Sequence, residues 1–369
     1  MKTPIFPDEN YSASVKEVIL PYLDSVRKGP EGFFERAPGE RIRYERFRTD
    51  QQPAKGEVVV FHGYTEGITK FYECLYYFLK EGYDVSMMEH RGHGRSYKLT
   101  QDRFKVVLPS ERDMMDDMHY FVTEIVLKDV VPGVRGGKGS SGASAGHAGK
   151  PLFLYGHSMG GGLGARFIEE WPDIFDRAIL TSPMLELNGG HVPKRLTALV
   201  ASRVIAHGRG EGLIPGAVPF NPDDPDGDFA NSCATSRDRY AWYQQYQLDN
   251  PDYQTSATTW ITALTFYSIT KDATTPIKCA AVKHPVLVFQ ADSDNMVEDG
   301  GQQRFIQRIP EGLGTLVRIP GSKHEIFRST TDVLEKYWPI VFDFLEGKEI
   351  PKELVKEVPR PRAFRRAAR

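Results

Sequence analysis

The sequence of 369 residues is poor in cysteine, with only Cys74, Cys233 and Cys279. No two of them have the spacing of a metal-binding motif, and an odd number argues against a disulfide framework. A reducing compartment fits this usage best. We therefore expect the protein in the cytoplasm.

Long apolar runs are also missing. No stretch approaches the ~20 apolar residues of a membrane-spanning helix. Residues 1–12 lack the basic start and apolar run of a signal peptide. The formal net charge of −2 gives no general attraction to nucleic acids or acidic membranes. We expect a protein that is soluble or attached to the inner face of a membrane only at its surface, without a nucleic-acid partner.

What the sequence does have is an alternation of strand and helix patterns. Hydrophobic residues make up 40% of it, enough for a sizeable core. Two alternating runs, 32–36 and 41–47, flank Pro38-Gly39 and indicate a hairpin. Apolar runs typical of strands buried on both faces then occur at 58–61, 85–88, 152–155, 178–181 and 285–289. Helical patterns lie between most of them, which predicts a mostly parallel central sheet flanked by helices.

The alternation fails between about 188 and 278, where Pro-rich loops and helical segments rich in Tyr and Trp take over. We interpret this stretch as an inserted helical cap above the site, with an apolar cleft beneath it. The predicted organisation is a lead-in with the first hairpin at 1–55, a first core part at 56–187 with a flexible Gly/Ser loop at 133–150, the cap at 188–280, a second core part at 281–347, and a polar Arg-rich tail at 348–369.

The strongest chemical signal is Gly156–Gly160, which reads Gly-His-Ser-Met-Gly. A predicted strand precedes it and a helical pattern follows it. A sharp strand-to-helix turn lifts the serine hydroxyl clear of the backbone, and the flanking glycines avoid clashes. Ser158 is therefore the predicted nucleophile. A chance match in a Gly-rich helix start would not explain the strand, turn and helix together.

A serine hydroxyl needs a base to remove its proton, and the base needs a carboxylate to orient it. Two histidines follow the predicted cap. His284 lies at the wrong end of a buried strand, whereas His324 lies in a turn between the last strand and the last helix, where the base belongs. The acid should follow the strand at 285–289, where both Asp292 and Asp294 could reach. One of the two is expected to be structural, because Asp is common in turns.

Acyl transfer also needs hydrogen-bond donors for the oxyanion. One expected donor is the backbone N–H of Met159, directly after the nucleophile. The second should come from the loop after the strand at 58–61, which reads His-Gly-Tyr-Thr-Glu-Gly. There the N–H of Tyr64 is the predicted donor, and Gly63 allows the backbone to approach closely.

Further motifs complete the pattern: His62-Gly63, residues 89–96 (Glu-His-Arg-Gly-His-Gly-Arg-Ser), residues 156–161 and residues 322–325 (Ser-Lys-His-Glu). From about Val58 to Leu345, apart from the Gly/Ser loop, the chain resembles the monoacylglycerol lipase and bacterial lysophospholipase branch of the α/β-hydrolases. The resemblance implies an α/β-hydrolase fold with an inserted helical cap. In that branch the acid follows a Gln-(small)-x-x-Asp pattern, which selects Asp294. Glu89 stands where the branch usually has Asp, and we expect a structural role there.

Within the cap, residues 235–240 (Thr-Ser-Arg-Asp-Arg-Tyr) are similar to a segment of bacterial lysophospholipases. Arg237 or Arg239 could contact a substrate phosphate, because arginine binds phosphate oxygens in a bidentate manner. A surface charge or an internal salt bridge is the alternative that we prefer. Residues 192–206 are amphipathic and could touch a membrane, although packing against the core is the simpler interpretation. We expect the basic residues at 360–369 to be solvated.

The leading hypothesis is a serine carboxylic-ester hydrolase that acts on single-acyl lipids through Ser158, His324 and Asp294, as a lysophospholipase. The alternatives are a monoacylglycerol lipase or esterase, and then a proline-type aminopeptidase, which would use carboxylates such as Asp223, Asp224, Asp226 and Asp228 to bind a free amine. A non-catalytic binder would predict an incomplete triad. We predict no metal and no cofactor, and the sequence does not indicate an oligomeric state.

Overall fold

The computed structural model describes residues 1–129, 150–188 and 194–360. Most of the expected Gly/Ser loop (133–149), the start of the amphipathic stretch (192–193) and most of the basic terminus (361–369) lie outside the described residues.

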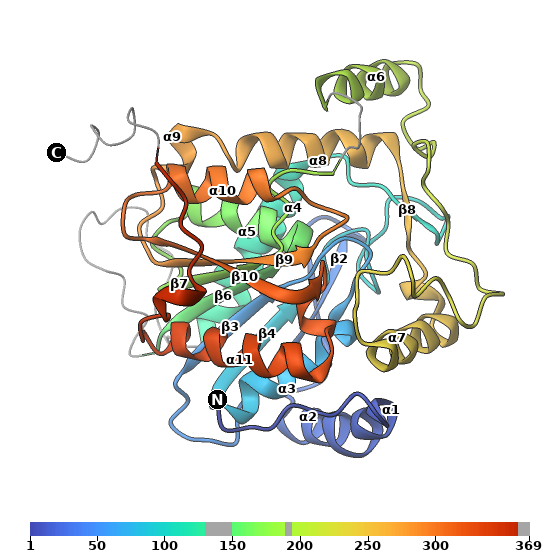
Figure 1. Ribbon diagram of the computed structural model, residues 1–369. Helices are drawn as coiled ribbons and strands as arrows, with labels where there is room; N and C mark the ends of the chain where they lie inside the picture. The colour runs from blue at the N-terminus through green and yellow to red at the C-terminus, as the bar shows by residue number, and fades with distance from the viewer. Residues whose placement is uncertain (130–149, 189–193, 361–369) are drawn as a thin grey trace.

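A single eight-stranded sheet runs through the middle of the described structure (Figure 1). β1 and β2 form the expected antiparallel hairpin, and β2 pairs antiparallel with β4. Every later neighbour is parallel, as predicted from the alternation of strands and helices. The spatial order is β1 (Gly32–Glu35), β2 (Arg41–Phe47), β4 (Tyr83–Met88), β3 (Gly56–Phe61), β6 (Leu152–His157), β7 (Arg177–Thr181), β9 (Val286–Ser293) and β10 (Gly314–Lys323).

Helices cover both faces of this sheet (Figure 1). Below it lie α1 (Tyr11–Ser14), η1 (Val15–Ile19), α2 (Leu20–Val26), η2 (Ile68–Phe71), α3 (Tyr72–Lys80) and α11 (Thr331–Leu345). Above it lie α4 (Glu111–Tyr120), η3 (Phe121–Val126), η4 (Leu127–Asp129), α5 (Ser158–Glu170) and α10 (Asp299–Arg308). Each layer buries its own apolar cluster against the sheet. The shorter η6 (Ile326–Arg328) and η7 (Lys352–Leu354) flank α11.

The central strands are buried on both faces, which explains their continuous apolar sequences. All residues of β3, β4 and β6 are buried. The carboxyl ends of parallel strands meet at one edge of a sheet, and ligands of open α/β sheets bind outside that edge. The loops after β3, β6, β9 and β10 carry the predicted site residues, so the fold brings them to one place.

Between 188 and 280 the described residues contain α6 (Lys194–Ala206), α7 (Arg237–Asp249), η5 (Pro251–Tyr253), α8 (Trp260–Asp272), α9 (Pro276–Cys279) and the two-residue strand β8 (Ala257–Thr258), which pairs with β5 (Lys105–Val106). α8 packs against α4 and α5, where Phe266 and Ile269 join the upper core cluster. α7 packs against α1, and α6 packs against α8 at the upper edge of the view (Figure 1). The division into core and cap remains a prediction.

Candidate active site

Ser158 lies at the junction between β6 and α5, where the chain turns sharply. Its φ of 51° lies in the left-handed region that a non-glycine residue rarely adopts. The Ser158 carbonyl accepts a hydrogen bond from the N–H of Met184 at 2.8 Å, which helps to hold this conformation. Strain of this kind is typical of functional turns, and here it presents the hydroxyl at the amino terminus of a 13-residue helix.

The glycines around Ser158 are required because other backbone segments lie in close contact. A Cβ at Gly156 would lie 2.7 Å from the carbonyl oxygen of Gly160, and a Cβ at Gly160 would lie 2.2 Å from that of Phe61. The helix α5 begins at Ser158 itself, so Gly160 lies in its first turn. Glycine is a weak helix former, so Gly160, Gly161 and Gly162 make the first turn of α5 hard to recognise in the sequence.

His324 joins Ser158 to Asp294. Its Nε2 lies 2.8 Å from Ser158 Oγ, and its Nδ1 lies 2.9 and 2.8 Å from the two carboxylate oxygens of Asp294. The ionised carboxylate accepts a hydrogen bond from the Nδ1–H group. The Nε2 atom then carries no proton and can accept the one from serine. All three side chains are largely buried. The structure thus brings together the three residues predicted as nucleophile, base and acid, in hydrogen-bonding geometry.

The two aspartates of the β9 turn have different surroundings. Burial alone would raise the pKa of the Asp294 carboxyl, but the hydrogen bond with His324 and the N–H groups of Val297 and Met296 hold that pKa below its usual range. Asp292 is exposed, and its carboxylate accepts only the N–H of Gly321 at 3.3 Å and lies 3.6 Å from Arg318. Of the two, Asp294 is the one placed to orient His324.

The predicted oxyanion donors flank the nucleophile. Met159 is the second residue of α5, where backbone N–H groups have no intrahelical acceptor. On the other side, Tyr64 follows Gly63, at which a Cβ would lie only 3.0 Å from Ser158 Cβ. The Tyr64 ring packs edge-on against Phe266, with ring centroids 4.9 Å apart, which fixes the start of this loop. Both donors therefore come from tightly constrained backbone.

Buried neutral histidines support the floor of the site. His62 Nε2 accepts the N–H of His90 at 2.9 Å, so its Nδ1 carries the proton and donates to the carbonyl of Gly63 at 2.7 Å. Burial and the neighbouring His324 lower the pKa of His157 well below its usual value. Burial and the neighbouring His90 and His93 do the same for His62. Their roles are structural, and among the described residues no cluster of His, Cys, Asp and Glu could hold a metal ion.

The expected structural role of Glu89 agrees with its surroundings. Its buried carboxylate accepts hydrogen bonds from the guanidinium of Arg43, the hydroxyl of Tyr253 and the N–H groups of Arg95 and Ile68. These partners come from β2, η5 and the loops after β3 and β4. Glu89 therefore fixes loops beneath the site and does not reach into it.

A buried ion cluster beside the triad was not predicted. Lys70 Nζ lies 2.9 Å from Glu66 Oε1 and 2.5 Å from Glu325 Oε1, while Glu325 Oε2 accepts from Arg328 at 2.5 Å. Glu66 also accepts the N–H of Gly63 at 2.5 Å. Lys70 and Glu325 are 255 positions apart, so the sequence gives no local indication that they pair. The one signal for the cluster is that Glu66 and Glu325 lie in the two motif loops.

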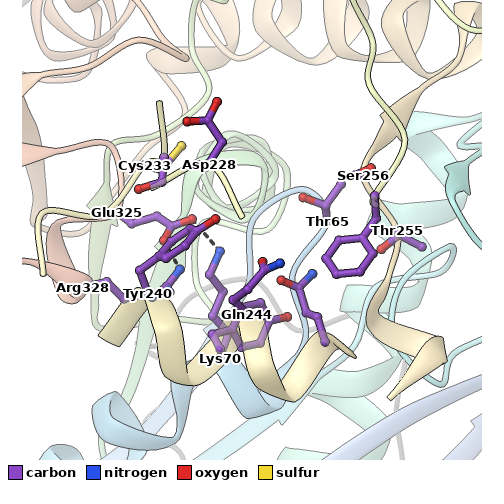
Figure 2. Close-up of a pocket in the computed structure, with 14 residues that line it drawn as sticks. Thr65, Lys70, Asp228, Cys233, Tyr240, Gln244, Thr255, Ser256, Glu325 and Arg328 are labelled. Atoms are coloured by element: carbon purple, nitrogen blue, oxygen red, sulfur yellow. Dashed lines mark hydrogen bonds and ion pairs between the residues drawn. The ribbon is translucent and has the colours of Figure 1, made fainter. Parts of the chain in front are cut away.

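A pocket of about 320 Å³ opens next to this cluster (Figure 2). Its lining includes Thr65 and Glu325, which directly follow Tyr64 and His324 and lie on opposite sides of the pocket in Figure 2. Tyr240 and Gln244 project into it from α7, as Figure 2 shows. Most of the remaining lining is also polar: Lys70, Asp228, Ser232, Gln247, Thr255, Ser256 and Arg328. Hydroxyl, amide and charged side chains make up most of this lining, so this pocket is not the expected apolar cleft, which remains a prediction.

The two arginines considered for a phosphate contact lie elsewhere. Arg239 is 1% exposed, and its guanidinium binds Glu73, Asp8 and the carbonyl of Phe6. All of these partners belong to the N-terminal segment and α3, so the internal salt bridge is the interpretation that its contacts fit. Arg237 is exposed, with its guanidinium 5.5 Å from the ring centroid of Phe229. Neither residue lines the pocket beside the triad.

Comparison with known proteins finds sequence similarity along most of the chain. The sequence model of the family described as serine aminopeptidase, S33, matches residues 52–331. A monoacylglycerol lipase from Mycolicibacterium smegmatis is 27% identical over 289 residues, covering 78% of this chain and 88% of the relative. Lysophospholipase L2 from Escherichia coli is 26% identical over 324 residues, covering 83% of this chain and 84% of the relative.

Among solved structures, a soluble variant of monoglyceride lipase from Saccharomyces cerevisiae, in complex with a substrate analog, superposes with a TM-score of 0.64. It is 18% identical and the match covers 88% of this chain and 97% of that one. At this identity the similarity shows the α/β-hydrolase fold.

Proposed function

Because this chain belongs to the serine aminopeptidase S33 family and is a serine hydrolase with the α/β-hydrolase fold, we propose that it hydrolyses carboxylic esters of single-acyl lipids through an acyl-enzyme on Ser158. The observation that carries the proposal is the continuous hydrogen-bonded chain from Ser158 Oγ through His324 to Asp294. The names of the lipase and lysophospholipase relatives support lipid esters as the substrate class.

The proposed reaction has two halves. Ser158 Oγ gives its proton to His324 Nε2 and attacks the ester carbonyl carbon, while the N–H groups of Met159 and Tyr64 stabilise the oxyanion. The alcohol half leaves with the proton from His324, and the acyl group remains on Ser158. Water then gives a proton to His324 and attacks the acyl carbonyl. Ser158 Oγ leaves, takes that proton from His324, and the fatty acid is released.

The head group is the finer question. The sequence favoured a lysophospholipid because of Arg237 and Arg239, but those side chains do not line the pocket. The cations that do, Lys70 and Arg328, are already paired with Glu66 and Glu325. A phosphate would have to compete with buried carboxylates for these cations. The polar pocket therefore favours an uncharged, hydroxyl-bearing head group, and supports the monoacylglycerol alternative.

The aminopeptidase alternative needs carboxylates that are free to bind an amine. Of the aspartates considered for this, only Asp228 lines the pocket, and its side chain accepts hydrogen bonds from Asn231. The buried carboxylates of Glu66 and Glu325 already share the ammonium of Lys70. Both observations favour an ester over an aminoacyl amide.

A substrate panel tests the proposal. It compares a monoacylglycerol, a lysophosphatidylcholine of the same acyl chain, a short p-nitrophenyl ester and an aminoacyl anilide, with Ser158→Ala as the inactive variant. Ser182→Ala is a matched control, since Ser182 is also buried with a positive φ. We expect hydrolysis of the lipid esters, fastest for the monoacylglycerol, by all but Ser158→Ala. Preference for the anilide would refute the substrate class.

The proposed partner beyond the substrate is a lipid surface, contacted through α6. None of the described helices is both long and apolar enough to cross a membrane. α6, however, lies against α8 at the edge of the described structure (Figure 1) and leaves Leu196, Leu199 and Val200 exposed, at 49%, 48% and 39%. Residues 194–209 contain four lysines and arginines and no acidic residue. Apolar side chains beside positive charge favour binding at an anionic membrane surface.

A further inference from the structure

Lys70 lies where two loops of the active site meet. We propose that Lys70 is a positioning residue, whose ammonium holds the oxyanion loop and the base loop in a fixed relative position. Its Nζ contacts Glu66 from the first loop at 2.9 Å and Glu325 from the second at 2.5 Å. The exposed fractions of these side chains are 9%, 3% and 9%. The inference rests on the proposed function only in taking Ser158 as the nucleophile.

The connection to the oxyanion loop passes through Glu66. While Oε1 binds Lys70, Oε2 accepts the N–H of Gly63 at 2.5 Å. Gly63 directly precedes Tyr64, the proposed donor, and a Cβ at Gly63 would lie 2.8 Å from Glu66 Oε2. The backbone is thus held between this carboxylate and Ser158. The Glu66 carboxylate therefore holds the His62–Gly63 peptide, which directly precedes the peptide that carries the Tyr64 N–H.

The connection to the base passes through Glu325, which directly follows His324. Its N–H donates to the carbonyl of Cys233 at 2.9 Å, and its carboxylate binds Lys70 and Arg328. Backbone and side chain of Glu325 are therefore both fixed. Because His324 shares a peptide bond with Glu325, the cluster limits the movement of the imidazole relative to Ser158.

Charge balance explains why the ammonium is needed. Glu66 and Glu325 are two buried carboxylates, and Lys70 and Arg328 are the cations that face them. His157 Nε2 lies 3.7 Å from Glu66, but burial and His324 keep the pKa of His157 far below its usual value, so that ring stays neutral. Burial alone would lower the pKa of Lys70, yet Glu325 and Glu66 raise it and keep it charged. Burial and Glu325 raise the pKa of Glu66, and Lys70 opposes this effect. Without Lys70, Glu66 is therefore favoured to take up a proton, and the ionic bridge between the two loops is lost.

The same contacts argue that Lys70 does not bind the substrate, although it lines the pocket. Two carboxylates and the face of Tyr243, whose ring centroid lies 5.2 Å from Nζ, surround its ammonium. A substrate oxygen would have to displace one of these partners. Positioning and substrate binding predict different kinetics, so they can be separated.

The test is the second-order rate of Ser158 labelling by a small alkyl fluorophosphonate that has no head group, together with kcat and KM for a monoacylglycerol. In the labelling step Ser158 Oγ attacks phosphorus, fluoride leaves and His324 takes the proton. For Lys70→Met we expect labelling and kcat to fall about 10²-fold with KM nearly unchanged, because small misplacements of reacting groups have effects of this size. Lys70→Arg, which can still bridge both carboxylates, should retain labelling within about tenfold of the wild type.

The matched control is Lys150→Met. Lys150 Nζ lies 2.5 Å from Asp84 and 3.6 Å from Glu57. The variant therefore also deprives buried carboxylates of a cation, but these lie at the amino-terminal ends of β3 and β4, away from the active site. It should lower the melting temperature and leave labelling unchanged. If Lys70→Met does not fold, Glu325→Gln replaces it, because Lys70 then keeps its ion pair with Glu66. For Glu325→Gln we expect labelling about tenfold slower than in the wild type.

Wild-type labelling rates in Lys70→Met, or in Glu325→Gln where that variant replaces it, would overturn the proposal. A raised KM with unchanged labelling would assign Lys70 to the head group instead, and would overturn it too. Labelling does not depend on which ester the enzyme prefers. A wrong substrate class would therefore leave the comparison between variants intact, and only an unlabelled wild-type Ser158 would remove its basis.

Discussion

Arg239 and Glu73 form a bidentate ion pair in the interior, with Nε and NH2 of the arginine each 2.8 Å from a carboxylate oxygen. Asp8 and the carbonyl of Phe6 complete the surroundings of the guanidinium. This arrangement ties α7 to α3 and to the N-terminal segment. A residue that the sequence suggested for phosphate binding is thus part of the connection between the expected cap and the core.

We predict that Arg239→Ala lowers the free energy of unfolding by about 3–5 kcal/mol, because it leaves Glu73 buried without its partner. Any loss of activity should be equal for a lysophospholipid and a monoacylglycerol. Chemical denaturation and parallel assays measure both effects. The control is Arg237→Ala on the exposed side of α7, which should change stability by less than about 0.5 kcal/mol. A selective loss on the lysophospholipid in either variant would restore the phosphate-binding interpretation.

The two aspartates after β9 should differ sharply in their effect on turnover. Asp294→Asn keeps the shape but removes the charge that orients His324, and we expect kcat to fall about 10⁴-fold. Asp292→Asn, which alters a carboxylate bound to the N–H of Gly321 and near Arg318, should stay within about threefold of the wild type. Steady-state kinetics on one soluble ester compares the two. A larger effect at Asp292 would mean that the acid has been misassigned.

Stability should fall as the pH drops from neutral towards 4. Burial lowers the pKa of His90 to about 3 and that of His93 to about 4, with a further contribution to His90 from His93. In the unfolded chain both would titrate near 6.5. Between about pH 6.5 and 4 the unfolded state therefore binds more protons than the folded state, so acidification favours unfolding. Each histidine contributes a slope of up to about 1.4 kcal/mol per pH unit.

Urea denaturation at pH 7, 6 and 5 measures this slope. His93→Gln should flatten it, whereas His207→Gln, at an exposed position on the far side of α6, should leave it unchanged. A wild-type free energy of unfolding that does not change over this interval would contradict the assignment of neutral buried histidines.

The α6 surface should contribute to membrane association but not to catalysis. We expect the double variant Leu196→Gln/Leu199→Gln to bind anionic phosphatidylglycerol vesicles at least tenfold more weakly, with kcat on a water-soluble ester unchanged. Leu354→Gln, which alters a similarly exposed leucine (41%) in η7, is the control and should bind like the wild type. Equal vesicle binding by all three proteins in flotation assays would exclude α6 as the contact.

Much of this site could be predicted because its signals are local. The strand, the Ser158 turn and the order of Ser158, Asp294 and His324 each lie within a few residues of recognisable sequence. The roles of Lys70 and Arg239 could not be predicted in this way. Their partners lie far away in the sequence, and a charged residue gives no indication of whether it is solvated or paired.

Glycines occur near the start of two helices for a packing reason. α10 contains Gly300 and Gly301, which weaken a helical pattern, yet a Cβ at Gly301 would lie 2.6 Å from the backbone of Leu185. The glycines at the start of α5 serve the same purpose beside Phe61 and Met184. In both cases close contact with a neighbouring segment outweighs helix propensity, and only the folded structure reveals that contact.

The central claim is that Ser158 is a nucleophile activated by His324, and covalent labelling tests it most directly. The protein is treated with a fluorophosphonate, digested and mapped by mass spectrometry. The account predicts one adduct, on Ser158, that is absent in Ser158→Ala, strongly reduced in His324→Ala and retained in Ser182→Ala. An adduct on another residue, or no adduct on the folded wild type, would contradict it.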